Sequence, residues 1–597
     1  MVKKFLALAL SLLMVLALVA GCNTGTSDTS TVPSSAPSTA PSKAPDNTGN
    51  DDDPVVDPAD PHDLLQDNPD SVSADHLGGL AFKYEIAPLN LPLTEKTETF
   101  TFWIESPNPT ANMLNLADGD MWQELERRTN IHVEMDHPAK GMEREQFMLV
   151  VNSGDLPEMM KNPEFYPGGF DKAMDDEIFI DMAEYMEWMP HYSAMVNSSE
   201  SVRRSVYTDT GRIGLIHFFQ YLEDGKKQKV NYGMAVREDL MIKNGWNKDL
   251  PETFDELEEL LTFFKDEAGF PNGPFPMSPN GVFGFSFMNG FFVNGGWRID
   301  TNTNKVEYSP IQEEFRQYVT LLNDWFNKGL IYRDFLSISG ELGSQGELWH
   351  GRLPIGVTFA IFAGDTQHIN GTNPDPDYNI VGIKNPVFEK GTKPMPSAYS
   401  IEDTTANAYM AFAITTACHN KPLLCRWWDY FFSSEGALLI NYGNIEGDGP
   451  DDWETTYYRG ADGRPILTNF IMRNPEFGSS EMMQQYIWHG CILGLYNREV
   501  DTETESQLAT HYRWSDQDFD SRYRPIPAAY VFLPDESTVY NAKYNDLQTY
   551  MQENTLKFIM GDRPLSEFDN FVSEVNGMGV EDVRAVVQSA VDRYFQR

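Results

Sequence analysis

The spacing of apolar positions predicts where the folded body begins and which elements it contains. Residues 97–105, TETFTFWIE, alternate as in a β-strand, with Phe100 and Phe102 on one face. Residues 121–130, MWQELERRTN, have the pattern of a helix, and residues 131–137, IHVEMDH, that of a second strand. A further helix, a turn and a short strand are predicted within 145–160. A strand–helix–strand order predicts a parallel sheet covered by helices.

Three later segments predict strong helices. In 250–267, LPETFDELEELLTFFKDE, Thr253 and Glu256 are spaced as a capping box and the apolar residues recur at helical spacing. Residues 420–443 predict a helix, a turn and a second short helix. Residues 579–597, GVEDVRAVVQSAVDRYFQR, place one apolar stripe along a helix. These elements together predict an α/β protein with two lobes.

The N-terminus has the layout of a secretory signal peptide. Lys3 and Lys4 precede an apolar run over residues 5–20, which small residues end. A membrane-spanning anchor would need about 20 apolar residues and flanking basic or aromatic anchors, whereas polar and acidic residues follow here. The tetrapeptide VAGC ending at Cys22 resembles the bacterial lipobox, in which the cysteine receives a diacylglycerol and becomes the mature N-terminus. We therefore expect a lipoprotein signal peptide over 1–21 and lipidation of Cys22.

A long polar segment follows the lipidated cysteine. Residues 22–80 are rich in Ser, Thr, Pro and Asp, as in TSDTSTVPSSAPSTAPSKAPDNTGNDDD. Such a composition buries too little apolar surface to offset chain entropy, so we expect a disordered linker. Flexible-chain scaling gives it a reach of about 40 Å. The linker would hold a folded body away from the membrane surface.

Composition limits the partners. The formal net charge of −44 disfavours nucleic acid and anionic lipid surfaces through repulsion. Aromatic residues make up 13% of the chain, which suits a site that stacks flat ligands such as sugars. Besides Cys22 the chain has Cys418, Cys425 and Cys491, an odd remainder that implies no disulfide framework and leaves a single pair open.

Several segments, in their order along the chain, resemble the family 1 extracellular solute-binding proteins of ABC importers, above all the large lipoproteins of Gram-positive, Paenibacillus-like bacteria. Each segment alone is a weak signal, but the order and the lipobox together are specific. The matching segments are SGDLPEMM (153–160), YGMAVREDLMIKNGWN (232–247), LPETFDELEELLTFFKDE (250–267), WHGRLPIGV (349–357), SSEGALLINYG (433–443), NIEGDGPDDWE (444–454) and the C-terminal GVEDVRAVVQSAVDRYFQR.

This resemblance implies a periplasmic-binding-protein type II fold, in which two α/β lobes joined by hinge strands close over a ligand. By analogy, residues 97–217 and 386–445 form lobe one and residues 218–385 form lobe two. Residues 446–597 supply C-terminal loops and helices that pack across the lobes. The implied partners are a carbohydrate ligand, the transmembrane subunits of an ABC permease and, through the acyl anchor, the extracellular face of the cell membrane. We expect a monomer.

The resemblance has one informative departure. Many relatives carry a calcium loop after the capped helix, whereas residues 265–281 here read KDEAGFPNGPFPMSPNG. Asp266, Glu267 and Asn272 lack the alternating oxygen ligands that calcium needs. We therefore expect no metal and no cofactor.

A sugar site needs aromatic platforms and planar polar groups, which loops at the carboxyl ends of strands supply. Trp103 is predicted on the face opposite Phe100 and Phe102 and hence less buried than they are, while Phe291 and Phe292 are predicted inside a helix. The alternative role of each candidate is core packing or an ordinary surface position. The candidate ligand-binding residues are Trp103, Glu105, Tyr166, Asn289, Trp297, Phe359, Phe362, Tyr399 and Trp453.

Enzyme signatures are missing from the sequence. It contains no HExxH, GxxxxGK[ST] or GxSxG motif, and 89 acidic residues guarantee chance carboxylate pairs. The sequence thus predicts a tethered, non-enzymatic receptor that captures an oligosaccharide for import. Two alternatives stay open: a lipoprotein that senses a ligand for a membrane histidine kinase, and a secreted glycan-degrading enzyme.

Overall fold

The computed structural model of the protein describes residues 89–104, 114–220, 229–230, 232–276, 285–338, 356–362, 375, 377–396, 400–401, 405–460, 463, 465–477, 479–487, 495–496, 513–514, 518–527 and 529–597. The signal peptide, Cys22 and the linker to residue 80 lie outside these residues, as does Cys491. Cys418 and Cys425 are buried free thiols. Burial raises the pKa of Cys418 to about 12, so this thiol stays protonated.

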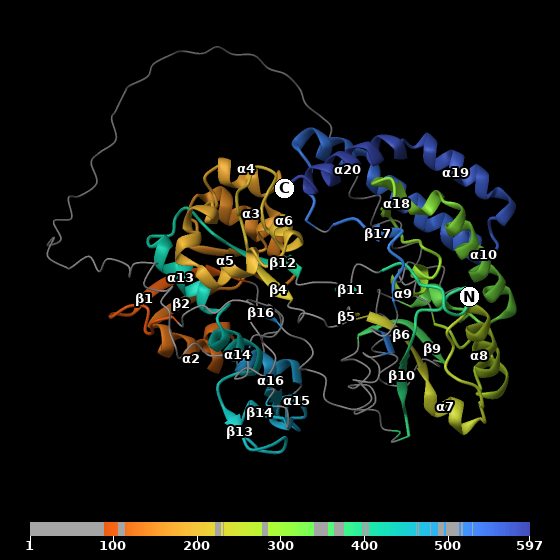
Figure 1. Ribbon diagram of the computed structural model, residues 1–597, viewed down its shortest axis with the longest axis horizontal. Coiled ribbons are helices and arrows are strands. Elements are labelled where there is room, and N and C mark those ends of the chain that lie inside the picture. The colour runs from red at the N-terminus through yellow and green to blue at the C-terminus, as the bar shows by residue number, and fades with distance from the viewer. Residues whose placement is uncertain are drawn as a thin grey trace, which may run out of the picture. The chain divides into compact units, whose positions relative to one another are not determined.

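The first lobe is built on a six-stranded sheet in the order β16-β4-β12-β3-β1-β2 (Figure 1). Strand β1 lies parallel between β2 and β3, whereas β12 runs antiparallel to both β3 and β4. The strands are β1 (Glu98–Trp103), β2 (Ile131–Asp136), β3 (Met159–Lys161), β4 (Ile216–Gln220), β12 (Thr405–Ile414) and β16 (Leu495–Tyr496). The predicted strand–helix–strand unit is confirmed, and β12 joins it from far along the chain.

Helices of this lobe begin and end where local signals indicate. Helix α2 is followed by the C-terminal cap Asn130, which has a φ of 60°, and α3 by the cap Gly154, with a φ of 74°, in the predicted turn. Ser433 caps the second helix of the 420–443 segment through a hydrogen bond from the Gly436 amide. The helices are α2 (Asp120–Thr129), α3 (Glu143–Ser153), α4 (Gly169–Asp175), α5 (Pro190–Val196), α6 (Glu200–Val206), α13 (Lys421–Tyr430) and α14 (Ser434–Tyr442).

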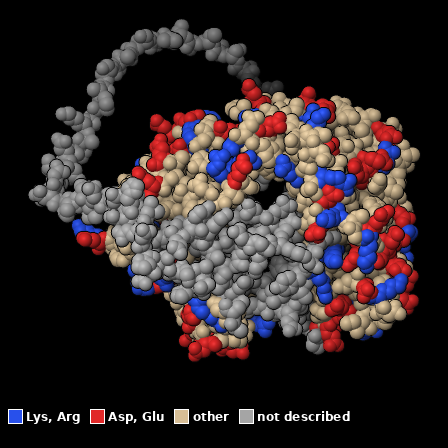
Figure 2. Space-filling view, in the orientation of Figure 1, with Lys and Arg blue, Asp and Glu red and all other residues tan. Residues whose placement is uncertain are grey.

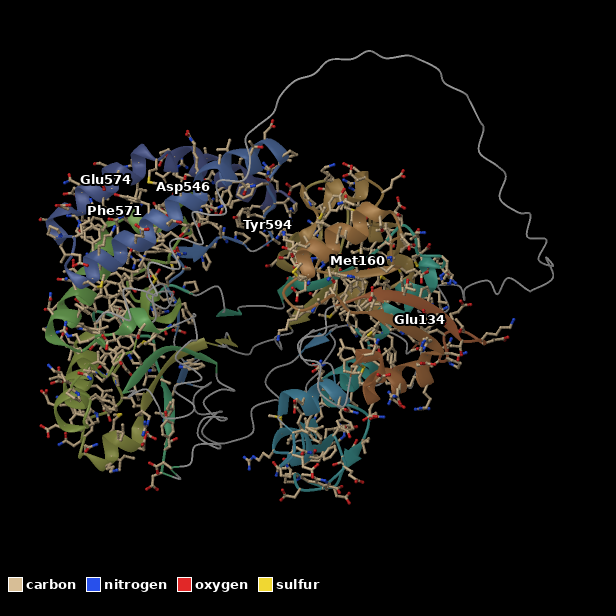
Figure 3. The ribbon with its side chains drawn as sticks, turned by 180° about the vertical axis from the view of Figure 1, so that it is seen from behind. Glu134, Met160, Asp546, Phe571, Glu574 and Tyr594 are labelled. Atoms are coloured by element: carbon tan, nitrogen blue, oxygen red, sulfur yellow. The ribbon has the colours of Figure 1, made fainter. Side chains whose placement is uncertain are left out.

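Both faces of the first sheet are buried. Phe100 and Phe102 belong to the larger core cluster, whereas Trp103 and Met160 belong to a second cluster on the other face. Met160 lies within β3 inside this lobe (Figure 3). Parallel strands covered by helices on both sides lose the simple inside–outside alternation.

The second lobe contains an antiparallel three-stranded sheet, β10-β6-β9. The predicted capping box is confirmed: Thr253 Oγ1 accepts from the Glu256 amide at 3.2 Å, and Glu256 accepts from the Thr253 amide at 3.1 Å. The elements are β6 (Tyr232–Arg237), β9 (Val357–Phe362), β10 (Ile380–Ile383), α7 (Glu238–Lys243), α8 (Phe254–Glu267), α9 (Phe285–Asn289) and α10 (Glu313–Lys328).

The C-terminal helices α18 (Pro534–Met560), α19 (Phe568–Gly577) and α20 (Val580–Tyr594) share the core of the second lobe (Figures 1 and 3). Helix α20 is also bonded to a loop of the first lobe. The carboxylate of Asp209 accepts from Arg593 Nε at 2.9 Å and from Arg597 Nε at 2.7 Å. Two guanidinium groups on one carboxylate make this a charge-assisted contact.

Smaller sheets complete the fold. A three-stranded sheet and two helices form a satellite with its own core: β13 (Glu446–Gly447), β14 (Tyr457–Arg459), β15 (Pro465–Leu467), α15 (Asn469–Met472) and α16 (Ser479–Tyr486). A second sheet, β17-β7-β8, contains β7 (Trp297–Asp300), β8 (Lys305–Tyr308) and β17 (Tyr523–Pro525), and β5 (Lys229–Val230) pairs with β11 (Ser400–Ile401).

One boundary falls later than the sequence suggests. The resemblance places residues 386–445 in the first lobe, but the Phe254 amide bonds to the Val387 carbonyl at 3.0 Å and the Met395 amide to the Asn289 carbonyl at 2.9 Å. The segment 386–395 therefore packs on the second lobe. Sequence patterns do not reveal this, because the contacts are made by a loop.

Acidic and basic side chains are interspersed over the described part of the face shown in Figure 2. On that part, the negative charge is spread and not gathered into one patch. No helix among the described residues is long and apolar enough to cross a membrane.

Candidate functional site

The carboxyl ends of the parallel strands β1, β2 and β3 lie at one edge of the first sheet. Trp103 is in register with Asp136 and with Met160, so the residues just beyond these strands are neighbours. Open α/β sheets bind ligands at such an edge.

Trp103 lies in the core. The prediction that its place on the face opposite Phe100 and Phe102 leaves it less buried than they are is therefore wrong. The side chain is 2% exposed and meets the Phe147 ring at 5.7 Å between centroids. Phe147 belongs to α3, which covers this second face of the sheet. Trp103 keeps a place at the strand end, but its ring is already packed.

His137 fixes the point where the chain leaves β1. Its Nδ1 bonds to the Ile104 carbonyl at 2.6 Å, and its Nε2 accepts from the Leu116 amide at 3.1 Å. Because Nε2 accepts, the proton of the neutral ring must be on Nδ1. The candidate Glu105 follows Ile104 directly and lies outside the described residues.

Tyr166 and Phe165 lie in the same aromatic cluster as Trp103. The Tyr166 hydroxyl donates to Asp176, and burial together with this carboxylate raises the pKa of Tyr166 to about 12. The Phe165 ring meets Phe147 edge-on at 5.7 Å and lies 5.3 Å from the guanidinium of Arg144. The structure thus brings Trp103 and Tyr166 together, with the outer side of the cluster partly exposed.

Sequence reasoning missed two polar residues at this edge. Lys161 is the last residue of β3 and Asn162 follows it, and both are buried. Asn162 has a φ of 57°, in the left-handed region. The available signal was a lysine closing an apolar strand immediately before Asn-Pro, since a buried lysine is rare.

In the second lobe the candidates Asn289 and Trp297 flank one irregular segment. Asn289 ends α9, is 3% exposed, and its Nδ2 has no hydrogen-bond partner among the described residues. Trp297 begins β7 and is buried, 4.8 Å from the Tyr308 ring and stacked at 6.1 Å on Tyr544. The Trp297 ring therefore packs in the core against one residue of β8 and one residue of α18.

Phe292 does not lie in a helix, so that prediction is wrong. Helix α9 ends at Asn289, and Phe292 has a φ of 60°. Phe291, also predicted inside the helix, lies beyond its end and is buried against Phe254 at 4.4 Å. Directly after the helix, Gly290 lies against the Pro386 carbonyl, which leaves no room for a β-carbon.

The remaining candidates either lie apart from these groups or have side chains that the structure does not describe. Phe359 and Phe362 are on β9, but their side chains are outside the described residues, as is Tyr399. Trp453 belongs to the satellite, is 49% exposed and meets Phe470 edge-on at 5.3 Å. Its ring is the most accessible aromatic surface among the described candidates.

Metal binding has no obvious place in this part of the chain. Within the described ranges, no three His, Cys, Asp or Glu side chains lie close enough to share an ion. The described candidates are four aromatic rings and the amide of Asn289, which can stack on and hydrogen-bond to a neutral polyhydroxylated ligand.

Sequence comparison finds no match: no protein-family profile and no curated protein matches the chain. Comparison with solved structures does find matches. An extracellular solute-binding protein from Bifidobacterium longum subsp. infantis matches with a TM-score of 0.64 and 14% identity, over 83% of this chain and 98% of its own.

Two further structures match over a similar extent. FusA, an ABC-transporter substrate-binding protein of S. pneumoniae solved with kestose, gives a TM-score of 0.62 at 17% identity, over 84% of this chain and 100% of its own. The alginate-binding protein AlgQ2, solved without calcium ion, gives 0.61 at 21% identity, over 84% and 99%. The chain has the two-lobe α/β fold of these solute-binding proteins.

Proposed function

We propose that the protein is a lipid-anchored solute-binding protein that captures an oligosaccharide between its two lobes and delivers it to an ABC importer. The likeness to FusA with kestose supports this most directly, because it extends over the whole of that chain. The similar structures are all of binding proteins, and AlgQ2 is also named for a carbohydrate. These names support a binding role.

The described candidates differ in how well they suit ligand contact. Tyr166 and Trp453 keep partly or largely exposed rings, whereas Trp103 and Trp297 are packed in cores. We therefore place stacking on the first two and a supporting role on the buried tryptophans. Glu105, Phe359, Phe362 and Tyr399 stay predictions from the sequence.

A thermal-shift screen with the full chain tests the ligand class. Binding raises the melting temperature by mass action, so oligosaccharides should produce shifts that grow with concentration and short peptides should not. A shift with peptides and none with any glycan would contradict the proposal. New reducing ends during incubation with glycans would indicate the enzyme alternative.

Anchoring and transport are tested in cells. Replacing Cys22 by Ala should abolish incorporation of a labelled fatty acid and release the protein from the membrane, because two acyl chains provide stable attachment. Deleting the gene should abolish uptake of the bound oligosaccharide. Unchanged uptake with loss of a transcriptional response would favour the sensor alternative.

A further inference from the structure

The turn that follows α9 holds an aromatic residue in a left-handed backbone conformation. Phe292 has a φ of 60°, and the other described non-glycine residues with positive φ are asparagines and glutamates: Asn130, Asn162, Glu177, Asn304 and Glu454. For a bulky side chain this conformation is an outlier. Strain of this kind persists only where its surroundings enforce it, and it gathers at functional sites.

A buried arginine enforces the conformation. Arg298 is 1% exposed, and its Nη1 donates to the Phe292 carbonyl. The same guanidinium pairs with Glu307 at 3.0 Å and lies 3.8 Å from the Tyr523 ring centre. A charged donor fixes the direction of the carbonyl and hence the turn.

The strain does not serve core packing. Phe291, next to it, fills the core against Phe254, whereas the Phe292 ring is only partly buried. Its neighbours are the Tyr523 ring at 6.3 Å and the guanidinium of Arg522 at 4.6 Å. The turn thus keeps an aromatic ring out of the core, at the cost of backbone strain.

An unsatisfied amide lies at the start of the same turn. The Phe292 amide bonds to the Asn289 carbonyl at 3.1 Å, which places the two residues together. The buried Nδ2 of Asn289 lacks a partner among the described residues, and leaving a buried donor unpaired is unfavourable. A ligand oxygen that reached the turn would satisfy it.

Charges around the turn are balanced, which bears on the class of sugar. Arg298 is paired with Glu307 and with Glu314 at 3.5 Å, and Arg522 is paired with Asp520 at 2.9 Å. Both described guanidinium groups that contact the turn are therefore already paired with carboxylates and are less available to a uronate carboxylate. The turn is better suited to a ring that carries only hydroxyl groups.

We propose that the turn 289–292 is the ligand-contact element of the second lobe and that it takes a neutral sugar residue. The Phe292 ring stacks on the apolar face of the sugar, and Asn289 Nδ2 donates to a sugar oxygen. This inference rests on the proposed oligosaccharide-binding function and specifies its ligand.

Two substitutions separate the strain from the contact. Phe292→Ala removes the ring and keeps the β-carbon, whereas Phe292→Gly removes the ring and the strain. Calorimetric titration of the full chain with neutral tetrasaccharides (malto-, cello-, xylo-, manno- and fructo-series) and with tri-mannuronate provides the affinities. We expect both variants to bind the neutral ligand about tenfold more weakly than the wild type. Asn289→Ala should weaken binding about fivefold.

The melting temperatures of the ligand-free variants measure the backbone strain at residue 292. Phe292→Gly should melt about 2 °C above Phe292→Ala, because release of the strain outweighs the chain entropy of glycine. Asn130 has the same φ of 60° at the C-terminal cap of α2, away from the carboxyl ends of the strands. Asn130→Gly and Asn130→Ala are the matched pair: the same difference in melting and unchanged affinity are expected.

Each result of these titrations either supports or contradicts the inference. If the wild type binds a neutral glycan and both Phe292 variants bind it within twofold as tightly, this inference is wrong while the proposed function stands. Binding of tri-mannuronate alone would overturn the neutral assignment. If the wild type binds no glycan, the proposed function fails and the inference with it. Should Phe292→Ala not fold, Phe292→Tyr, which keeps the ring, must bind like the wild type and Phe292→Gly must not.

Discussion

Arg298 is the residue on which the second-lobe turn depends, and its replacement provides a sharp test. Arg298→Met keeps much of the volume but removes the donor to the Phe292 carbonyl and the cation on Tyr523. A charge-assisted hydrogen bond contributes about 1.5–3 kcal/mol, and a desolvated cation–π contact about 1–2 kcal/mol. Glu307 and Glu314 are each about one-third exposed and can hydrate, so freeing them adds little.

The turn should therefore lose about 3–4 kcal/mol of local stability. Hydrogen exchange of the ligand-free full chain, followed in peptides covering residues 285–300, reports local opening. An increase of about 100- to 1,000-fold in exchange rate is expected, since about 1.4 kcal/mol corresponds to a factor of ten. Peptides from α13 in the other lobe should be unchanged.

Arg522→Ala is the matched control. Its guanidinium also faces Phe292, at 4.6 Å, but its side chain is 58% exposed and its ion pair is on the surface. Exposed pairs contribute less than about 1 kcal/mol, so exchange should rise less than about fivefold. Unchanged exchange in Arg298→Met, or an equal effect of Arg522→Ala, would refute the role of the buried guanidinium.

Three further predictions concern pH, packing and the satellite. Burial lowers the pKa of His217 to about 4, so this imidazole stays neutral in the folded state, whereas in the unfolded state it takes up a proton below about pH 6.5. The free energy of unfolding should therefore fall by about 2 kcal/mol between pH 7 and pH 5. Denaturant titrations at both pH values should show a smaller fall for His217→Asn. Gly233→Ala would bring a β-carbon within 2.2 Å of the Trp514 ring, and a loss of about 2–3 kcal/mol is expected; an unchanged denaturation midpoint would contradict the close approach. Trp453→Ala should leave stability within about 1 kcal/mol, because its ring is half exposed; a tenfold loss of glycan affinity would place it in the site, and equal affinity would exclude it.

Local sequence signals predicted individual elements well where the information lies within one turn or one strand. The capping box at Thr253 and Glu256 specified the start of α8, and Gly154 specified the end of α3. The apolar stripe of the last segment specified the buried face of α20. The sequence pattern does not predict α18, the longest described helix, because its N-terminal half is polar around most of its circumference. This helix is positioned by packing on α10.

Candidate site residues were harder to predict, because burial depends on partners distant in sequence. Trp103 alternates away from Phe100 and Phe102, yet α3 covers that face and takes the ring into a core. Tyr166 and Trp453 have the partly or largely exposed rings that a stacking role needs, while Glu105 and Tyr399 stay predictions.

The sequence by itself determined the class of fold, the order of the main elements and the expected export and lipidation at Cys22, because these depend on composition, periodicity and spacing within short segments. Tertiary structure alone decided that β12 enters the sheet between β3 and β4, that α18 to α20 complete the second core, and that Phe292 adopts a left-handed turn. The physical reason is the same in each case. Strand partners, shared cores and the guanidinium of Arg298 act between residues that only folding brings together.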